Sequence, residues 1–207
     1  MLSFHGWAGT GKNFVSNITI KNIFKNGMES HFVYFVLGPH ALKKQSQAGE
    51  YGDYIHDLVT SSVGACSRSL FFFDDIDHIP DGVLDALVPF IMNTPNADNI
   101  DFRISMFIFL SNAGSHAIYE LTLKHVKEGK RREDLKLHNV EHLVTAEVYG
   151  STGGLHGSQL IEKHLISHFI PFLPMEREHI KQCIRADIAR KGYHATDQIV
   201  NEVADMM

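Results

Sequence analysis

The sequence predicts an α/β fold, with a mostly parallel central sheet flanked by helices and the start of a small helical lid after it. Two observations favour this fold. Short apolar runs of strand length alternate with longer stretches of helical spacing up to Pro174. Beyond Pro174 the apolar runs stop and two helical stretches remain. We therefore expect two domains, residues 1–174 and residues 175–207.

The predicted elements follow from composition and period. Five apolar runs are typical of buried parallel strands, at Leu2–His5, Phe32–Leu37, Ser69–Phe73, Met106–Ser111 and Phe169–Leu173. Helical spacing predicts helices over residues 12–26, 51–64, 82–93, 116–128, 133–148, 176–191 and 196–206. Segments rich in Gly, Ser and Pro predict loops at residues 38–49, 93–101 and 150–158. Gly192 is a typical helix stop between the last two helices.

Composition limits the classes of function. The 207 residues carry 19 Lys and Arg against 24 Asp and Glu, a formal net charge of −5. With no long basic run, we expect no nucleic-acid partner. No run of about eighteen apolar residues predicts a membrane-spanning helix. Cys66 and Cys183 permit one disulfide at most.

A glycine-rich loop separates the first predicted strand from the first predicted helix. It matches the phosphate-binding pattern G-x-x-x-x-G-K. Backbone amides and the helix N-terminus would face the phosphates, and Lys12 would reach the β- and γ-phosphates. Asn13 stands where Ser or Thr normally ligates Mg²⁺, and its amide oxygen can also coordinate. The predicted residues for ATP and Mg²⁺ binding are Gly6, Trp7, Ala8, Gly9, Thr10, Gly11, Lys12, Asn13 and Phe14.

Two later strands end in polar side chains. The strand ending at Phe73 continues into Asp74 and Asp75, which is a Walker B pattern. Asp74 would hold Mg²⁺ and Asp75 would polarise the attacking water, although Asp75 is one methylene shorter than the usual Glu. The next strand runs into Asn112, predicted to orient that water beside the γ-phosphate. The alternative is that Asn112 caps a helix beginning near Ser115.

With these residues in hand, the chain resembles the torsins, a branch of the AAA+ ATPases related to the ClpB-type unfoldases. The Asn-bearing loop carries the resemblance together with the segments 65–69, 106–114, 132–134 and 169–174. The resemblance implies a P-loop AAA+ domain followed by the beginning of a C-terminal helical lid. It also implies slow ATP hydrolysis by a chaperone-like or membrane-remodelling protein of the endoplasmic reticulum lumen and nuclear envelope.

The resemblance implies partners as well. Torsins lack an arginine finger and hydrolyse ATP when the luminal domain of a lamina-associated polypeptide-one-type protein supplies one. A homo-oligomer fits the family, and the client protein is not indicated. Both ends of the chain look cut, so we interpret it as a fragment. Membrane association is then expected only through a missing N-terminal segment, and Cys183 would pair with a cysteine of a missing sensor-two motif.

Other interpretations stay open. A non-hydrolysing, nucleotide-dependent interaction module is favoured by Asp75 and by the missing sensor-two motif. A P-loop small-molecule kinase would need an arginine-rich lid, and none stands out between residues 116 and 150. The candidate arginine fingers are Arg103, Arg131 and Arg132. We expect none of them to act, because Arg103 precedes a buried strand and the other two lie in a charged turn.

Overall fold

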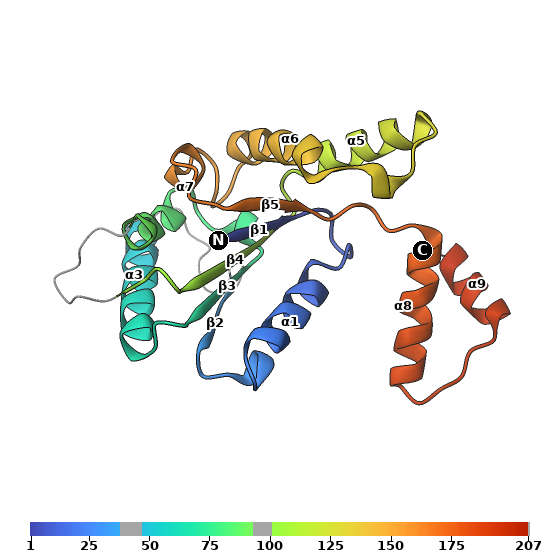
Figure 1. Cartoon of the computed structure of the whole chain (residues 1–207), viewed down its shortest axis with the longest axis horizontal. Helices are drawn as coiled ribbons and strands as arrows, with labels where there is room; N and C mark the ends of the chain where they lie inside the picture. Colours follow the sequence, from blue (N-terminus) through green and yellow to red (C-terminus); the bar gives the residue numbers. More distant parts are fainter. Residues whose placement is uncertain (38–46, 93–100, 207) are drawn as a thin grey trace. The chain divides into compact units, whose positions relative to one another are not determined.

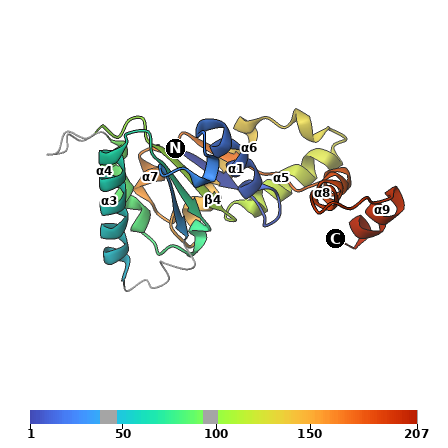
Figure 2. The same cartoon turned by 90° about the horizontal axis from the view of Figure 1, so that it is seen from below.

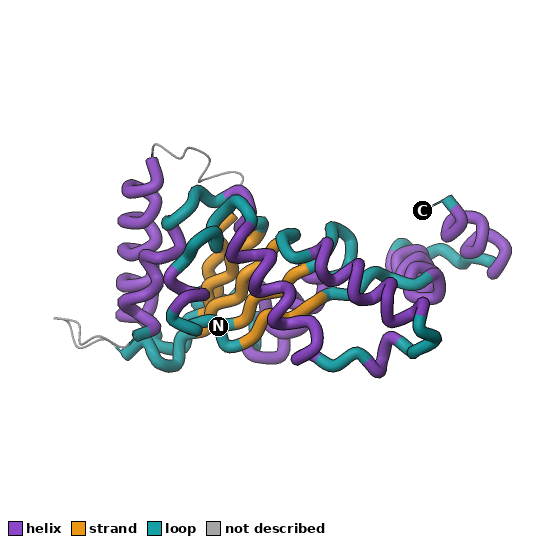
Figure 3. Tube along the Cα trace, turned by 90° about the horizontal axis from the view of Figure 1, so that it is seen from above, coloured by secondary structure: helices purple, strands orange, loops and turns teal. Residues whose placement is uncertain are grey.

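The computed structural model describes residues 1–37, 47–92 and 101–206. Its centre is a five-stranded sheet in the order β2-β3-β4-β1-β5, in which each neighbouring pair runs parallel. Figure 3 shows these strands lying side by side as one layer. The strands are β1 (Leu2–His5), β2 (Val33–Leu37), β3 (Leu70–Asp74), β4 (Met106–Ser111) and β5 (His168–Pro171).

Strand order brings three chain segments to one edge of the sheet. β4 lies between β1 and β3, with His5 opposite Ser111 and Phe73 opposite Phe109. Because the strands are parallel, their carboxyl ends meet at the same edge. The loops that follow β1, β3 and β4 are therefore neighbours, although they lie far apart in the sequence.

Alternation along the strands builds a separate core on each face of the sheet. Phe71 and Phe73 of β3 pack on one face, while Leu70 and Phe72 pack on the other. The first face is covered by side chains of α3, η4, α5 and α6, and the second by α1 through Ile20. Figures 1 and 2 show α1 across one face and α5 with α6 on the opposite side.

In chain order, the helices described before Pro174 are α1 (Lys12–Ile23), η1 (Gly27–Glu29), α3 (Ala48–Ala65), η3 (Ile76–His78), η4 (Val83–Leu87), α4 (Val88–Ile91), α5 (Ser115–Lys127), η5 (Arg132–Asp134), α6 (Leu137–Gly150) and α7 (Gln159–Glu162). Of these helices, α1, α3 and α5 lie close to their predicted ranges, whereas η1, η3 and α7 were not predicted. None of the helices in the described ranges is both long and apolar enough to cross a bilayer.

The helix predicted over residues 82–93 is wrong as a single α-helix. The structure has the 3₁₀ helix η4 followed by the short α4. Pro89 explains the break, because proline has no N–H to donate to a carbonyl four residues earlier and is accepted only in the first turn. Likewise, the helix predicted over residues 133–148 is divided: the 3₁₀ helix η5 ends at Asp134, Leu135 and Lys136 are extended, and α6 begins at Leu137.

Other differences are smaller. The last strand was predicted at Phe169–Leu173 and lies at His168–Pro171, in register with the four residues of β1. Most of the predicted loops at 38–49 and 93–101 falls on residues 38–46 and 93–100, outside the described residues. The described end of the first loop is already helical, because α3 begins at Ala48.

The chain divides into two compact units, Met1–Leu173 and Pro174–Met207. The predicted boundary lay one residue later. The second unit holds α8 (Arg177–Arg190) and α9 (Asp197–Asp205). These two helices are joined by ion pairs between Arg177 and Asp205 and between Arg185 and Asp197.

Candidate nucleotide-binding site

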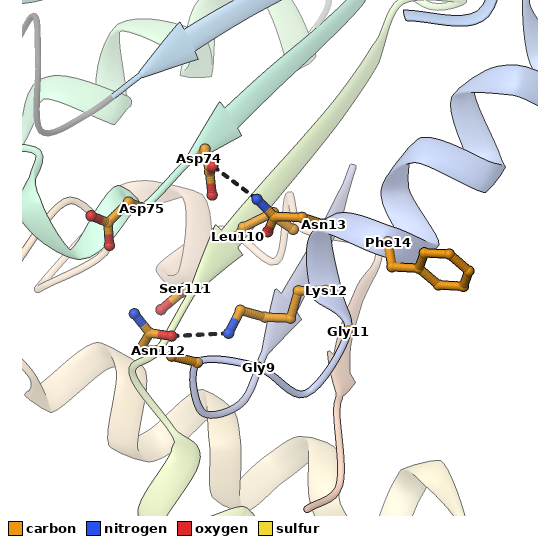
Figure 4. A pocket seen from close by; sticks show the side chains of 11 residues that line it. Gly9, Gly11, Lys12, Asn13, Phe14, Asp74, Asp75, Leu110, Ser111 and Asn112 are labelled. Carbon is orange, nitrogen blue, oxygen red and sulfur yellow. Dashed lines mark hydrogen bonds between the residues drawn. The ribbon is translucent and has the colours of Figure 1, made fainter. Parts of the chain in front are cut away.

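A cavity of about 480 Å³ opens at the carboxyl edge of the sheet, next to the ends of β1, β3 and β4. Figure 4 shows the side chains that surround it. Its lining consists of Ala8, Gly9, Gly11, Lys12, Asn13, Phe14, Asp74, Asp75, Leu110, Ser111 and Asn112. Three predicted residues, Gly6, Trp7 and Thr10, belong to the loop but not to this lining. All three predicted sequence motifs therefore meet at one cavity.

The loop after β1 has a backbone that requires glycine at two critical places. Gly6 passes so close to the chain just after β5 that an added Cβ would lie 2.6 Å from the carbonyl oxygen of Phe172. Gly11 has a φ of 96°, in the left-handed region, and α1 starts at the next residue. The loop therefore places the N-terminus of α1 at the cavity. The backbone N–H groups of a first helical turn have no partner within the helix, so they can bind an anion there.

Lys12 projects from the first turn of α1 into the loop. Its Nζ donates to the carbonyl oxygen of Gly6, to that of Trp7 at 3.0 Å and to Oδ1 of Asn112 at 2.9 Å. Burial lowers the pKa of Lys12, whereas the carboxylates of Asp77, Asp74 and Asp75 act to raise it. The ammonium group thus stands between the loop and the end of β4, where it can meet a phosphate group.

Asp74 and Asn13 face each other across the cavity. Nδ2 of Asn13 donates to Oδ2 of Asp74 at 3.1 Å, as Figure 4 shows. A carboxylate and an amide oxygen are donors of the kind that Mg²⁺ takes. The contact shows that both side chains reach one point beside the loop, with the amide nitrogen of Asn13 facing Asp74. With the Asn13 amide turned over, so that its Oδ1 takes the place of Nδ2, the two side chains offer oxygen ligands that fit a magnesium ion.

Asp75 has an uncommon backbone conformation and a partner of its own. Its φ is 55° and its ψ is 48°, a left-handed conformation that Asp tolerates better than most residues. Its Oδ2 lies 2.9 Å from Nδ1 of His78. Figure 4 shows Asp75 apart from the pair formed by Asp74 and Asn13. The sequence interpretation missed His78, which the three-residue spacing from a Walker B carboxylate could have signalled.

Asn112 points toward the loop rather than along the next helix. Its side chain accepts the hydrogen bond from Lys12. α5 begins at Ser115 after Gly114, whose φ is 80°, and no side chain caps that end. The alternative of Asn112 as a helix cap is therefore wrong. Two residues that sequence reasoning missed hold this turn, because the carboxylate of Asp77 accepts from the hydroxyl of Ser111 at 2.5 Å.

His5 is fully buried beneath the site, at the end of β1. Its Nε2 is hydrogen-bonded to Oγ of Ser3 at 2.6 Å, and its Nδ1 to the carbonyl oxygen of Ala113 at 2.9 Å. Burial lowers the pKa of His5 to about 4, and the bond to Ala113 and the charge of Asp77 offset only part of that effect. The imidazole is therefore neutral at pH 7 and ties β1 to the turn after β4.

Because the pKa of His5 is lower in the folded chain than its ordinary value, the unfolded chain binds the proton more readily. The contribution of neutral His5 to the free energy of unfolding is present above about pH 6.5 and is lost as the pH falls toward 4. From pH 7 to pH 5, this group removes about 2 kcal/mol of unfolding free energy. Between pH 7 and pH 5, we expect the free energy of unfolding of His5→Asn to fall by about 2 kcal/mol less than that of the unmodified chain, measured by urea unfolding. The exposed His56→Asn is the control, and an unchanged pH dependence in His5→Asn would contradict the assignment.

A phosphate-binding loop, a Walker B strand and a polar residue on the strand between them, all on a parallel sheet, define a P-loop AAA+ domain. The yeast Hsp104–ADP complex has the same fold, with a TM-score of 0.56 and 16% identity over 91% of this chain and 31% of that chain. The Torsin family model matches residues 1–73. The chain belongs to the torsin family.

Curated relatives agree with this assignment. A Torsin-like protein of Caenorhabditis elegans is 38% identical over 192 residues, 93% of this chain and 54% of the relative. A Torsin-like protein of Drosophila melanogaster is 39% identical over 191 residues, 92% of this chain and 56% of the relative. Torsin-3A of Mus musculus is 33% identical over 208 residues, 100% of this chain and 54% of the relative. The chain spans about half the length of the curated relatives it matches.

Proposed function

We propose that this chain binds ATP with Mg²⁺ and is the nucleotide-binding part of a partner-activated ATPase. One observation carries the proposal: Lys12, Asp74 and Asn112, which follow or end three adjacent strands, converge on one cavity. Such convergence at the carboxyl edge of a parallel sheet is where nucleotides bind in folds of this class.

Each residue then has a role that its position supports. The amides of the loop and the ammonium of Lys12 bind the phosphates, exchanging the carbonyl partners of Lys12 for phosphate oxygens. Asp74 and Asn13 hold Mg²⁺, which when bound neutralises charge on the β- and γ-phosphates. Asn112 stands beside Lys12 and orients the attacking water.

Asp75 is the proposed base that polarises that water. Its carboxylate lines the cavity but is occupied by His78, so activity requires a change of partner or of side-chain rotamer at Asp75. The same observation favours a second candidate function, a nucleotide-dependent interaction module that does not hydrolyse ATP. In that case the pair of Asp75 and His78 persists with nucleotide bound.

The wider setting of this activity is part of the same proposal. We infer a chaperone-like or membrane-remodelling protein of the endoplasmic reticulum lumen and nuclear envelope, which the luminal domain of a lamina-associated polypeptide-one-type protein activates and which also assembles as a homo-oligomer. The site supports the need for an activator, because none of the cavity-lining residues in the described part of the chain is an arginine.

Hydrolysis tests the proposal through Asp75. We expect Asp75→Asn to retain ATP affinity within about threefold and to lose at least about a hundredfold in turnover, because an amide cannot accept the proton of water. Asp75→Glu is expected to keep or raise turnover. Turnover is measured by phosphate release from full-length protein with its activator.

A matched control is Asp57→Asn, because Asp57 is also beside a histidine but lies on the exposed surface of α3. It should turn over ATP at the rate of the unmodified protein. Equal turnover in Asp75→Asn would contradict the role of Asp75. An activated, unmodified protein that binds ATP without releasing phosphate would favour the interaction module.

A further inference from the structure

The carboxylate of Asp77 binds the turn that carries Asn112. Oδ1 of Asp77 accepts from the hydroxyl of Ser111 at 2.5 Å and from the backbone N–H of Ala113 at 3.4 Å. Oδ2 accepts from the backbone N–H of Asn112 at 2.6 Å. One carboxylate therefore receives donors from three consecutive residues at the end of β4.

These bonds restrict the backbone on both sides of Asn112. Hydrogen bonds to an ionised carboxylate are shorter and stronger than neutral ones. The N–H of Ala113 also donates to the hydroxyl of Ser111 at 2.9 Å, and its carbonyl is hydrogen-bonded to His5. The peptide groups around Asn112 are thus held from two directions, which leaves its amide aimed at Lys12.

The backbone around Asp77 is held in place by the loop 151–158. It lies in η3, where the N–H of Gly154 donates to the carbonyl of Ile76 at 3.1 Å. Gly153 packs so tightly against this segment that an added Cβ would lie 2.4 Å from the carbonyl oxygen of Asp77. The carboxylate therefore acts from a rigid support, the segment 76–78 clamped by the loop 151–158.

We propose that Asp77 is a positioning residue for recognition of the γ-phosphate, acting through the turn 111–113 and the amide of Asn112. The inference rests on the proposed function. Among the described residues that line the cavity, Ser111 and Asn112 are present and Asp77 is not, so its effect is transmitted through them. ATP and ADP should depend on this turn differently, because only ATP has a γ-phosphate for Asn112 to meet.

A purely electrostatic role would have the opposite signature. A carboxylate near the cavity repels phosphate, and ATP carries more negative charge than ADP. Removing the charge of Asp77 without disturbing the turn would therefore raise the affinity for ATP more than that for ADP. Loss of positioning would lower the ratio of ATP affinity to ADP affinity. The sign of the change separates the two roles.

The experiment compares affinities of the whole chain for ATP and ADP, each with Mg²⁺, by calorimetry. Fluorescence of Trp7, the single tryptophan and part of the loop, provides a second readout. We expect Asp77→Asn to lower the ATP-to-ADP affinity ratio about tenfold, the effect of one hydrogen bond to a charged group. Ser111→Ala, which removes one of the three donors, should lower it about threefold.

The control is Glu141→Gln. The carboxylate of Glu141 also accepts from a backbone N–H, that of Phe169 at 2.9 Å, but it holds β5 instead of the end of β4. This variant should change the unfolding midpoint but not the ratio. An unchanged or raised ratio in folded Asp77→Asn would overturn the inference, and if that variant does not fold, Ser111→Ala alone decides. An unmodified chain that binds neither nucleotide would contradict the proposed function instead.

Discussion

Replacing Lys12 with alanine is expected to weaken ATP binding about a hundredfold or more. Each hydrogen bond between an ammonium group and a phosphate contributes about 1.5–3 kcal/mol, and the lysine of such a loop makes contacts with both terminal phosphates. In the structure Lys12 is mostly buried, and its ammonium already faces Asn112 at the cavity. Calorimetry with ATP and Mg²⁺ measures the loss.

Lys21→Ala is the matched control. Lys21 is on the same helix, in its last turn, with its side chain exposed. ATP affinity should be unchanged in this variant. The unfolding midpoint of Lys12→Ala should be measured too, because the substitution leaves the carbonyls of Gly6 and Trp7 without their lysine partner. A folded Lys12→Ala chain with unchanged affinity would remove the phosphate-binding role of the loop.

The second large effect concerns activation. We expect the protein alone to hydrolyse ATP very slowly, and a partner's luminal domain that inserts an arginine to raise the rate by about 10³–10⁵. Two of the three arginines considered as internal fingers form ion pairs with carboxylates of this chain. Arg103 forms a two-bond pair with Asp101, and Arg131 pairs with Asp134. Phosphate release with and without the partner measures the activation.

Single replacement of Arg103, Arg131 or Arg132 by alanine provides the comparison. Each variant should keep activated turnover within about threefold, the range of a lost exposed ion pair. Partner binding is measured in parallel, so that loss of the complex is not mistaken for loss of a finger. A fall of several hundredfold in any one of them, with the complex intact, would show that this chain supplies its own arginine.

The strands and the cavity-lining motifs were predictable because they rest on local rules. Apolar runs such as Phe71–Phe73 are continuous because both faces of the sheet are covered, and that signal survives in a single sequence. The glycines of the phosphate loop predict a backbone with positive φ, which other residues rarely adopt. The prediction for residues 82–93 was wrong, because the spacing of apolar residues does not distinguish the 3₁₀ helix η4 from the α-helix α4 that follows it.

The supporting residues of the site differ in how far they could be predicted. Asp77 looks like one more acidic residue in a loop until β3 and β4 lie side by side and bring Ser111 to it. That contact depends on where two chain segments cross, and one sequence carries no record of it. The spacing of His78 from Asp75 is visible in the sequence, but the left-handed turn at Asp75 that brings the two side chains together is not.

The sequence alone thus determined the elements and the residues that carry chemistry, because period, turn composition and motif spacing are properties of neighbouring residues. Only the tertiary structure decided the strand order, which sets β4 between β1 and β3. That order places Asn112 against Lys12, with Asp77 behind it. The physical reason is that such contacts join residues many positions apart, and packing of the whole domain selects which of them form.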